Sequence, residues 1–363
     1  MDLEPLAKEI REHGTAGRAV RPVGGGTKLG WGASGPEGAV DLETSGLDAI
    51  AEHNVGDFTA VLGAGVRLAD AQARFAAEGQ MLALDPPLGA SDGATVGGMI
   101  ATADSGPLRH RYGGVRDLVV GVTVALSDGT LAKSGGKVIK NVAGYDLAKL
   151  FAGSYGTLGL IVRVAVRLHP MPPRTATAVG ASEDPDVLGA AAISLAGHPL
   201  EADCLDVDWR NGAGRLLVRF GSAAARDQAA ATVARMEALG LEERGVIEDD
   251  DAVWMAQRVR QRGACILKVS GRISDLPAVC RTGADIVGRA GLGLFWLGLE
   301  PDHVAEVREA LAPRACTLLD APAALRAHAW AEPDPGALAV MARIKERFDP
   351  ARIFRPGAFV GGI

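Results

Sequence analysis

A glycine-rich segment near the start of the chain has the residue types of a phosphate site. Gly24-Gly25-Gly26 is followed directly by Thr27 and Lys28. Consecutive glycines leave the backbone free to adopt positive φ, and successive N–H groups can then turn inward and form an anion-binding nest. Thr27 adds a hydroxyl donor and Lys28 adds a cation. The segment therefore predicts a cradle for a pyrophosphate.

Two familiar nucleotide motifs do not fit the residues. A Walker A loop needs a Lys-Ser or Lys-Thr pair after its last glycine, whereas Thr27-Lys28 has the reverse order and no such pair follows. Gly63-Ala64-Gly65 begins like a dinucleotide fingerprint, but Leu68 occupies the position of the third glycine, where a small residue lets helix and strand pack closely. This second segment predicts an ordinary strand-to-helix turn.

Further glycine clusters follow in the first half of the chain. Gly97-Gly98, Gly106, Gly113-Gly114 and the segment 153–159 each stand at the end of an expected strand or helix. Because glycine lets a ligand approach the backbone closely, the set predicts one extended ligand with a diphosphate near its middle.

Composition narrows the class of protein. The chain has 363 residues, of which 48% are hydrophobic, and a net charge of −6. That length allows about two domains, and the negative charge argues against nucleic acid as a partner. The four cysteines form no CxxC pair and the seven histidines are scattered. We therefore expect neither an iron–sulfur cluster nor a metal site, and we expect the cysteines to be buried and reduced. The first residues lack the blocks of a signal peptide, and no apolar run approaches the ~20 residues of a membrane helix.

Hydrophobic periodicity predicts an α+β fold. The clearest strand is 158–168, with apolar residues at alternate positions, and the prolines at 170, 172 and 173 mark a domain boundary. Beyond them, strands alternate with alanine-rich helices, a texture typical of helices layered on an antiparallel sheet. We expect strands at 19–22, 39–42, 58–62, 116–126, 131–134, 158–168, 204–209, 215–220, 265–270 and 293–299, and helices at 1–13, 67–78, 184–197, 222–239, 251–261, 275–290, 302–311 and 335–347.

Residues 21–32 and 85–170 resemble the FAD-linked oxidases of the vanillyl-alcohol oxidase / p-cresol methylhydroxylase (PCMH) superfamily, and within it the FAD-binding subunits of bacterial glycolate oxidases. The most specific matches are 140–147 and 153–159, and 348–357 resembles the family's end. The resemblance implies a two-subdomain PCMH-type FAD-binding domain at 1–174. It implies a smaller α+β cap domain with an antiparallel sheet at 175–330, and a C-terminal segment, 331–363, that returns to the first domain.

The resemblance also implies the residues that contact FAD. They are Gly24, Gly25, Gly26, Thr27, Lys28, Thr95, Gly97, Gly98, Thr102, Ser105, Gly106, Lys140, Gly156, Gly159 and Ile161. The first loop is implied to bind the pyrophosphate, the second to lie along the cofactor, and the segment 156–161 to approach the adenine and ribose. Lys140 is expected near the isoalloxazine, where a cation stabilises the reduced flavin. Thr27 stands where some relatives carry an attachment histidine, so we expect FAD to be held non-covalently.

Catalytic residues are harder to assign. The late histidine-rich motif of the superfamily's hydroxy-acid dehydrogenases is missing. His110 and Tyr145 are the nearest candidates for the general base that such chemistry needs. The run Arg258–Arg262 is expected to mark the solvated face of a helix. Arg355 stands where relatives commonly have Asn before Pro-Gly.

The function implied by the resemblance is that of a subunit. It would hold FAD in a glycolate oxidase-type complex that oxidises a small 2-hydroxy acid to a 2-oxo acid. The expected partners are a homologous catalytic flavoprotein subunit and an iron–sulfur subunit that takes the electrons. We expect a cytoplasmic chain that meets the membrane only through partners. Two alternatives stay open: a free-standing FAD-dependent dehydrogenase of a small hydroxy acid or alcohol, and a structural subunit without cofactor, which the intact glycines disfavour.

Overall fold

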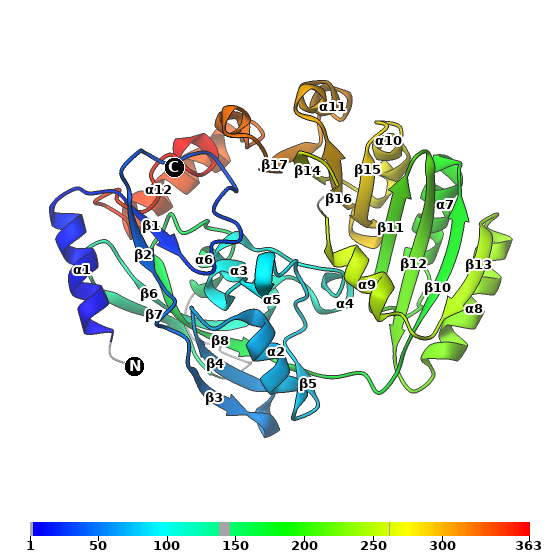
Figure 1. Cartoon of the computed structure of the whole chain (residues 1–363), viewed down its shortest axis with the longest axis horizontal. Coiled ribbons are helices and arrows are strands. Elements are labelled where there is room, and N and C mark those ends of the chain that lie inside the picture. Colours follow the sequence, from blue (N-terminus) through cyan, green and yellow to red (C-terminus); the bar gives the residue numbers. More distant parts are fainter. Residues whose placement is uncertain (1–2, 138–145, 261) are drawn as a thin grey trace. The chain divides into compact units, whose positions relative to one another are not determined.

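The computed structural model describes residues 3–137, 146–260 and 262–363. The chain divides into two compact units, coloured along the sequence in Figure 1. The first unit contains Met1–Ser105, Gly114–Met171 and Glu332–Ile363, and the second contains Gly106–Gly113 and Pro172–Ala331. The roles assigned from the sequence, with 1–174 binding FAD and 175–330 forming a cap, stay predictions.

The first unit combines small sheets with short helices. Its elements are α1 (Glu4–Thr15), β1 (Val20–Val23), β2 (Val40–Glu43), β3 (Ile50–Asn54), β4 (Thr59–Gly63), α2 (Leu68–Ala76), β5 (Gln80–Met81), α3 (Val96–Thr102), α5 (Val115–Leu118), β6 (Val119–Ala125), β7 (Leu131–Gly135), α6 (Ala148–Phe151), β8 (Leu160–Arg167), β9 (His169–Pro170) and α12 (Pro335–Phe348). The two strands expected on either side of the glycine loop, β1 and β2, pair in parallel.

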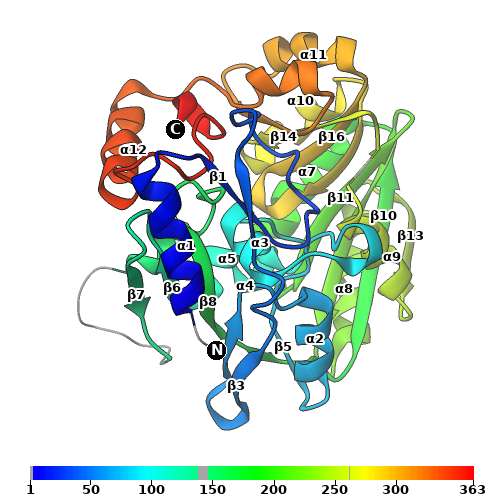
Figure 2. The same cartoon turned by 60° about the vertical axis from the view of Figure 1, so that its left-hand side comes forward.

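A five-stranded antiparallel sheet organises this unit, in the order β3-β4-β8-β6-β7. The central strand β8 is apolar and buried on both faces, apart from Arg163 in its middle and Arg167 at its end. Because β4 pairs antiparallel with both β3 and β8, the segment 61–68 is a strand-to-helix turn and not part of a parallel βαβ unit. Helix α1 lies beside β6 and β7 (Figure 2), and its Arg11 side chain donates to the Asp128 carbonyl in the β6–β7 turn.

The C-terminal segment adds to the first unit beside β1. Val20 donates to the Ile353 carbonyl at 2.7 Å, and Arg355 donates back to the Val20 carbonyl at 2.9 Å. Lys345 of α12 is 4% exposed, and its ammonium donates to Asp349, to the Thr157 carbonyl and to the Phe354 carbonyl. A buried ammonium with three acceptors fixes the end of the chain to the glycine cluster at 153–159.

The second unit is an antiparallel sheet with helices. Its elements are α4 (Arg109–Tyr112), β10 (Thr175–Ser182), α7 (Pro185–Ala196), β11 (Cys204–Arg210), β12 (Ala213–Gly221), α8 (Ala225–Ala238), β13 (Glu242–Ile247), α9 (Asp251–Arg258), β14 (Cys265–Ser270), α10 (Leu276–Cys280), β15 (Asp285–Arg289), β16 (Leu294–Leu299), α11 (Val304–Ala310) and β17 (Ala315–Asp320). The strand order is β13-β10-β12-β11-β15-β16-β14-β17. The predicted α+β class with an antiparallel sheet is confirmed.

The two faces of this eight-stranded sheet differ in chemistry. One face is apolar and packs against α7, α8, α10 and α11, with Leu216, Phe295 and Leu297 in its core. The opposite face carries charged pairs, among them Arg289 with Asp206 and Arg219 with Asp250. In each of these two pairs the opposite charge offsets part of the desolvation cost of the buried charge.

Several expectations about elements are wrong. The expected helix 275–290 ends at Cys280, and 285–289 form strand β15 between β11 and β16. The expected strand 116–126 begins at Val119, because 115–118 form α5. Strands β3, β10, β13 and β17 were not predicted.

The expected solvated helix face at Arg258–Arg262 is also wrong. Helix α9 ends at Arg258, and the Arg260 side chain is 5% exposed over the Trp296 ring, with 4.5 Å between its guanidinium carbon and the ring centroid. Arg262 pairs with Asp208 at 2.7 Å. These arginines belong to the polar face of the sheet.

The state of the cysteines agrees with the expectation from the sequence, and the helix lengths bear on membrane spanning. Cys204, Cys265, Cys280 and Cys316 are free and buried, as predicted, and burial raises the pKa of the Cys280 thiol to about 12. Among the described residues, every helix is too short or too polar to cross a membrane.

Candidate functional site: a cradle for a dinucleotide

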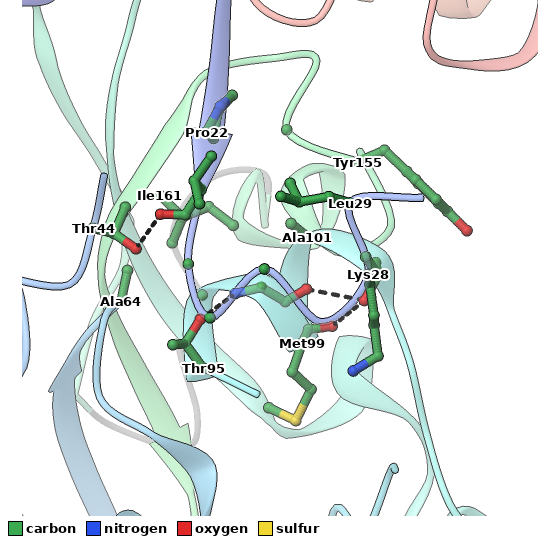
Figure 3. Close-up of a pocket in the computed structure, with 18 of the residues that line it drawn as sticks. Pro22, Lys28, Leu29, Thr44, Ala64, Thr95, Met99, Ala101, Tyr155 and Ile161 are labelled. Carbon is green, nitrogen blue, oxygen red and sulfur yellow. Dashed lines mark hydrogen bonds between the residues drawn. The ribbon is translucent and has the colours of Figure 1, made fainter. Parts of the chain in front are cut away.

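Four segments far apart in the sequence line one pocket in the first unit. They are the first glycine loop with the end of β1, the segment 94–102 with α3, the segment 155–161 that enters β8, and Arg355 of the C-terminal segment, and Thr44 and Ala64 complete the lining. Figure 3 shows Pro22, Thr95, Tyr155 and Ile161 around it. The space, including its open side, is about 690 Å³.

The first glycine loop presents backbone donors without protein acceptors. Within the described part of the chain, no hydrogen bond is recorded for the N–H groups of Gly24, Gly25, Gly26 and Thr27. Polar backbone groups are nearly always satisfied in a folded protein. Successive free N–H groups that line a concave surface are what an anion-binding nest requires, so the loop fits a pyrophosphate.

The glycines of this loop are required by close packing more than by backbone conformation. The sequence suggested positive φ for all three, but only Gly26 has it, at 71°. A Cβ on Gly25 would lie 1.6 Å from the Gly93 carbonyl oxygen, and one on Gly24 would lie 2.2 Å from the Thr95 hydroxyl. Gly24 and Gly25 are therefore required by the close approach of the loop to the segment 93–95.

The second loop positions helix α3 and has its own N–H groups satisfied. Thr95 caps the helix by accepting from Gly98, while Val96 and Gly97 donate to the Val66 and Ala64 carbonyls. A Cβ on Gly97 would lie 2.7 Å from the Ala64 side chain, so this glycine lets α3 approach the end of β4. The Thr102 hydroxyl donates to the Gly98 carbonyl at 2.9 Å. Contact between this loop and a ligand would therefore be mainly by shape.

The charges that line the pocket are positive. Lys28 and Arg355 are its charged lining residues, and no Asp or Glu lines it within the described residues. The Lys28 ammonium lies 3.5 Å from a carboxylate oxygen of Asp104, which is buried, and 3.3 Å from the Pro87 carbonyl. An anionic ligand is favoured by such a lining.

Most residues predicted to bind the cofactor come together in this pocket. All of them line it except Ser105, Gly106 and Lys140. Ser105 is buried beside Asp104, Gly106 groups with the second unit, and Lys140 lies outside the described residues. The pocket brings the predicted residues together, while their contacts with FAD stay a prediction.

The two candidate bases do not line this pocket. His110 belongs to α4 and packs in the second unit beside Gly291, and burial lowers the pKa of its imidazole. Tyr145 lies outside the described residues.

Some lining residues were missed from the sequence. Tyr155 has a positive φ of 56° between Ser154 and Gly156, and Thr44 donates to the Val23 carbonyl at the end of β1. Arg355 was noted only as a departure from the family's pattern. Its two terminal nitrogens donate to the Tyr155 and Trp31 carbonyls, contacts that no local pattern indicates.

Comparison with known proteins agrees with the geometry. Residues 2–135 match the family described as FAD binding domain. The chain is 42% identical over 108 residues to the glycolate oxidase subunit GlcE of Escherichia coli, covering 30% of this chain and 31% of that protein. It is 34% identical over 177 residues to a mitochondrial D-lactate dehydrogenase (cytochrome) of Arabidopsis thaliana, covering 49% of this chain and 30% of that protein. The chain thus matches about a third of the length of these relatives.

A solved structure of alkyldihydroxyacetonephosphate synthase shares the fold. It superposes with a TM-score of 0.70 at 14% identity, and the match covers 97% of this chain and 74% of that one. The fold, the nest and the domain match define an FAD-binding flavoprotein. The relatives named glycolate oxidase subunit and D-lactate dehydrogenase agree with the family resemblance seen in the sequence, and the predicted cofactor, FAD, is confirmed.

Proposed function

We propose that the chain is the FAD-binding subunit of a glycolate oxidase-type complex, which oxidises a small 2-hydroxy acid to the 2-oxo acid. The observation that carries this proposal is the 42% identity over 108 residues to a glycolate oxidase subunit, together with a glycine loop whose N–H groups line the pocket. In this reaction the substrate loses two electrons and two protons. An iron–sulfur partner is proposed to take the electrons onward.

The chain's own residues are proposed to bind and orient the cofactor. The N–H groups of Gly24 to Thr27 would hold the pyrophosphate, and the open backbone at Gly156 and Gly159 would let the adenosine half approach β8. FAD supplies a two-electron acceptor when bound. Within the described residues, no His, Asp or Glu lines the pocket. The general base that the reaction needs is therefore proposed to come from a homologous flavoprotein subunit.

The cofactor is proposed to be held without a covalent bond. Thr27, which lines the pocket, stands where some relatives carry the attachment histidine, and a threonine hydroxyl is a much weaker nucleophile than an imidazole. Acid precipitation of the purified chain should leave FAD in the supernatant. A yellow pellet would show a covalent attachment and overturn this point.

Capture from the native host tests the subunit role. The tagged chain should retain a second flavoprotein and an iron–sulfur protein, and glycolate should reduce the flavin of the complex much faster than that of the isolated chain. If the chain is isolated without either partner under conditions that preserve complexes, the subunit proposal fails.

The match to a D-lactate dehydrogenase supports a second candidate, a free-standing FAD-dependent dehydrogenase of a small hydroxy acid. The same assay separates the two. Fast reduction of the isolated, FAD-loaded chain by D-lactate or glycolate would favour this second candidate over the subunit.

A further inference from the structure

The two cations of the pocket are in different electrostatic situations. Lys28 lies beside the buried carboxylate of Asp104, 3.5 Å from it. The pair sums to no net charge, and Figure 3 shows the Lys28 side chain leaving the loop on the side away from Pro22. The cation expected from the glycine-loop sequence to neutralise a phosphate is thus already partnered by an acid.

Arg355 carries a positive charge without an acid partner. Its side chain donates to two carbonyl oxygens, of Tyr155 at 2.9 Å and of Trp31 at 3.3 Å. Arg355 is 9% exposed, and no ion pair with a carboxylate is recorded for it within the described residues. Burial, together with the positive charge of Arg21, lowers the pKa of its guanidinium. A buried cation is costly unless an anion pairs with it.

The position of Arg355 indicates which anion that is. Arg355 lines the same pocket as the glycine loop. One of its carbonyl partners, Trp31, follows this loop in the sequence, and the other, Tyr155, belongs to the turn before β8. Because guanidinium groups match phosphate oxygens in geometry, we infer that Arg355 binds the diphosphate of the dinucleotide and supplies the net positive charge of the cradle. This inference rests on the assignment of the pocket to FAD.

Binding of FAD to the apo chain tests the inference without any turnover. FAD titrations at low and high salt, followed by flavin fluorescence, give the Kd of the wild type and of three variants. Arg355→Gln should raise the Kd roughly ten- to hundredfold and flatten its salt dependence, because the charge is lost. Arg355→Lys should keep the salt dependence, because the charge remains, and lose part of the affinity, because an ammonium lacks the guanidinium geometry. Arg352→Gln, an exposed arginine three residues earlier, is the matched control and should bind like the wild type.

A role of the Arg355 charge and a purely structural role of its hydrogen bonds lead to different results for these variants. If R355Q binds FAD with the wild-type Kd and salt dependence, the inference is wrong. If R355K shows the same flat salt dependence as R355Q, the charge at this position does not contribute to FAD binding, which also overturns the inference. Should R355Q fail to fold as an apo protein, judged by thermal unfolding, the comparison of R355K with the wild type still decides. A wild-type chain that binds FAD but serves no hydroxy-acid oxidation would contradict the proposed function and leave Arg355 assigned.

Discussion

At the scale of single residues, Gly25 has the tightest surroundings in the cradle. Because a Cβ would lie 1.6 Å from the Gly93 carbonyl oxygen, Gly25→Val must push the glycine loop off the segment 93–95. We expect a loss of about 3 kcal/mol of folding free energy and a loss of FAD retention, measured by urea unfolding and by flavin content after gel filtration.

Gly46→Val is the matched control for this substitution. Gly46 is exposed, and a Cβ there would have no neighbour within 4 Å. This variant should retain FAD and unfold like the wild type. If G25V also retains FAD like the wild type, the glycine loop is not the cradle.

A second prediction at the residue scale concerns Asp203 of the second unit and the pH dependence of stability. Burial raises the pKa of its carboxyl to about 6, against the opposing charges of Arg111 and Arg219. The unfolded chain has a pKa of about 3.9 there, so the folded state binds the extra proton between these values. The contribution of Asp203 to stability is therefore largest below pH 4 and falls as the pH rises through 6, by on the order of 2 kcal/mol.

Asp203→Asn removes this titration and tests the sign. The difference in unfolding free energy, wild type minus D203N, should become less favourable to the wild type between pH 4 and 7 in urea titrations. Asp249→Asn, at an exposed position of the same unit, serves as the control. Parallel profiles for wild type and D203N would contradict the prediction.

At the scale of elements, α12 is fixed to the first unit by one buried ammonium. Lys345→Met leaves the Asp349 carboxylate, which is fully buried, without its cation at 2.6 Å. Breaking a buried pair costs about 3–5 kcal/mol, and loss of the bond to the Thr157 carbonyl should loosen the turn that lines the pocket. We expect a lower melting temperature and a raised Kd for FAD. Lys8→Met, which breaks an exposed pair with Glu12, should change stability by less than about 1 kcal/mol, and equal effects of the two variants would contradict this account.

The helices and strands show which elements can be predicted from local sequence patterns. Strand β8 was found because strict alternation is specific to strands, whereas 285–289 were expected to be helical. Ile286 and Val287 become a strand because β16, directly after them, and β11, far earlier in the chain, pair on either side of them. The pairing with the distant β11 leaves no local pattern. Strand β10 was missed for a related reason, since its alternating Thr and Ala residues are weakly apolar.

At the scale of the whole molecule, the sequence predicted those parts of the candidate site where a ligand or a neighbouring segment must approach the backbone closely. Most of the pocket lining could be predicted from the glycine clusters, because a glycine in the sequence marks a position without a side chain. The electrostatics were not predictable, because Lys28 meets Asp104 and Arg355 meets the Trp31 and Tyr155 carbonyls only through the fold. A residue's type thus indicated its chemistry, while its partner was set by contacts between distant segments.

The central claim is that this chain holds FAD in the cradle by non-covalent contacts. The most direct measurement is the flavin content of the purified full-length chain, before and after acid precipitation, with reconstitution of any apo protein by added FAD. We predict a yellow protein that releases an equimolar amount of FAD into the acid supernatant. A colourless protein that cannot be reconstituted with FAD would contradict the account.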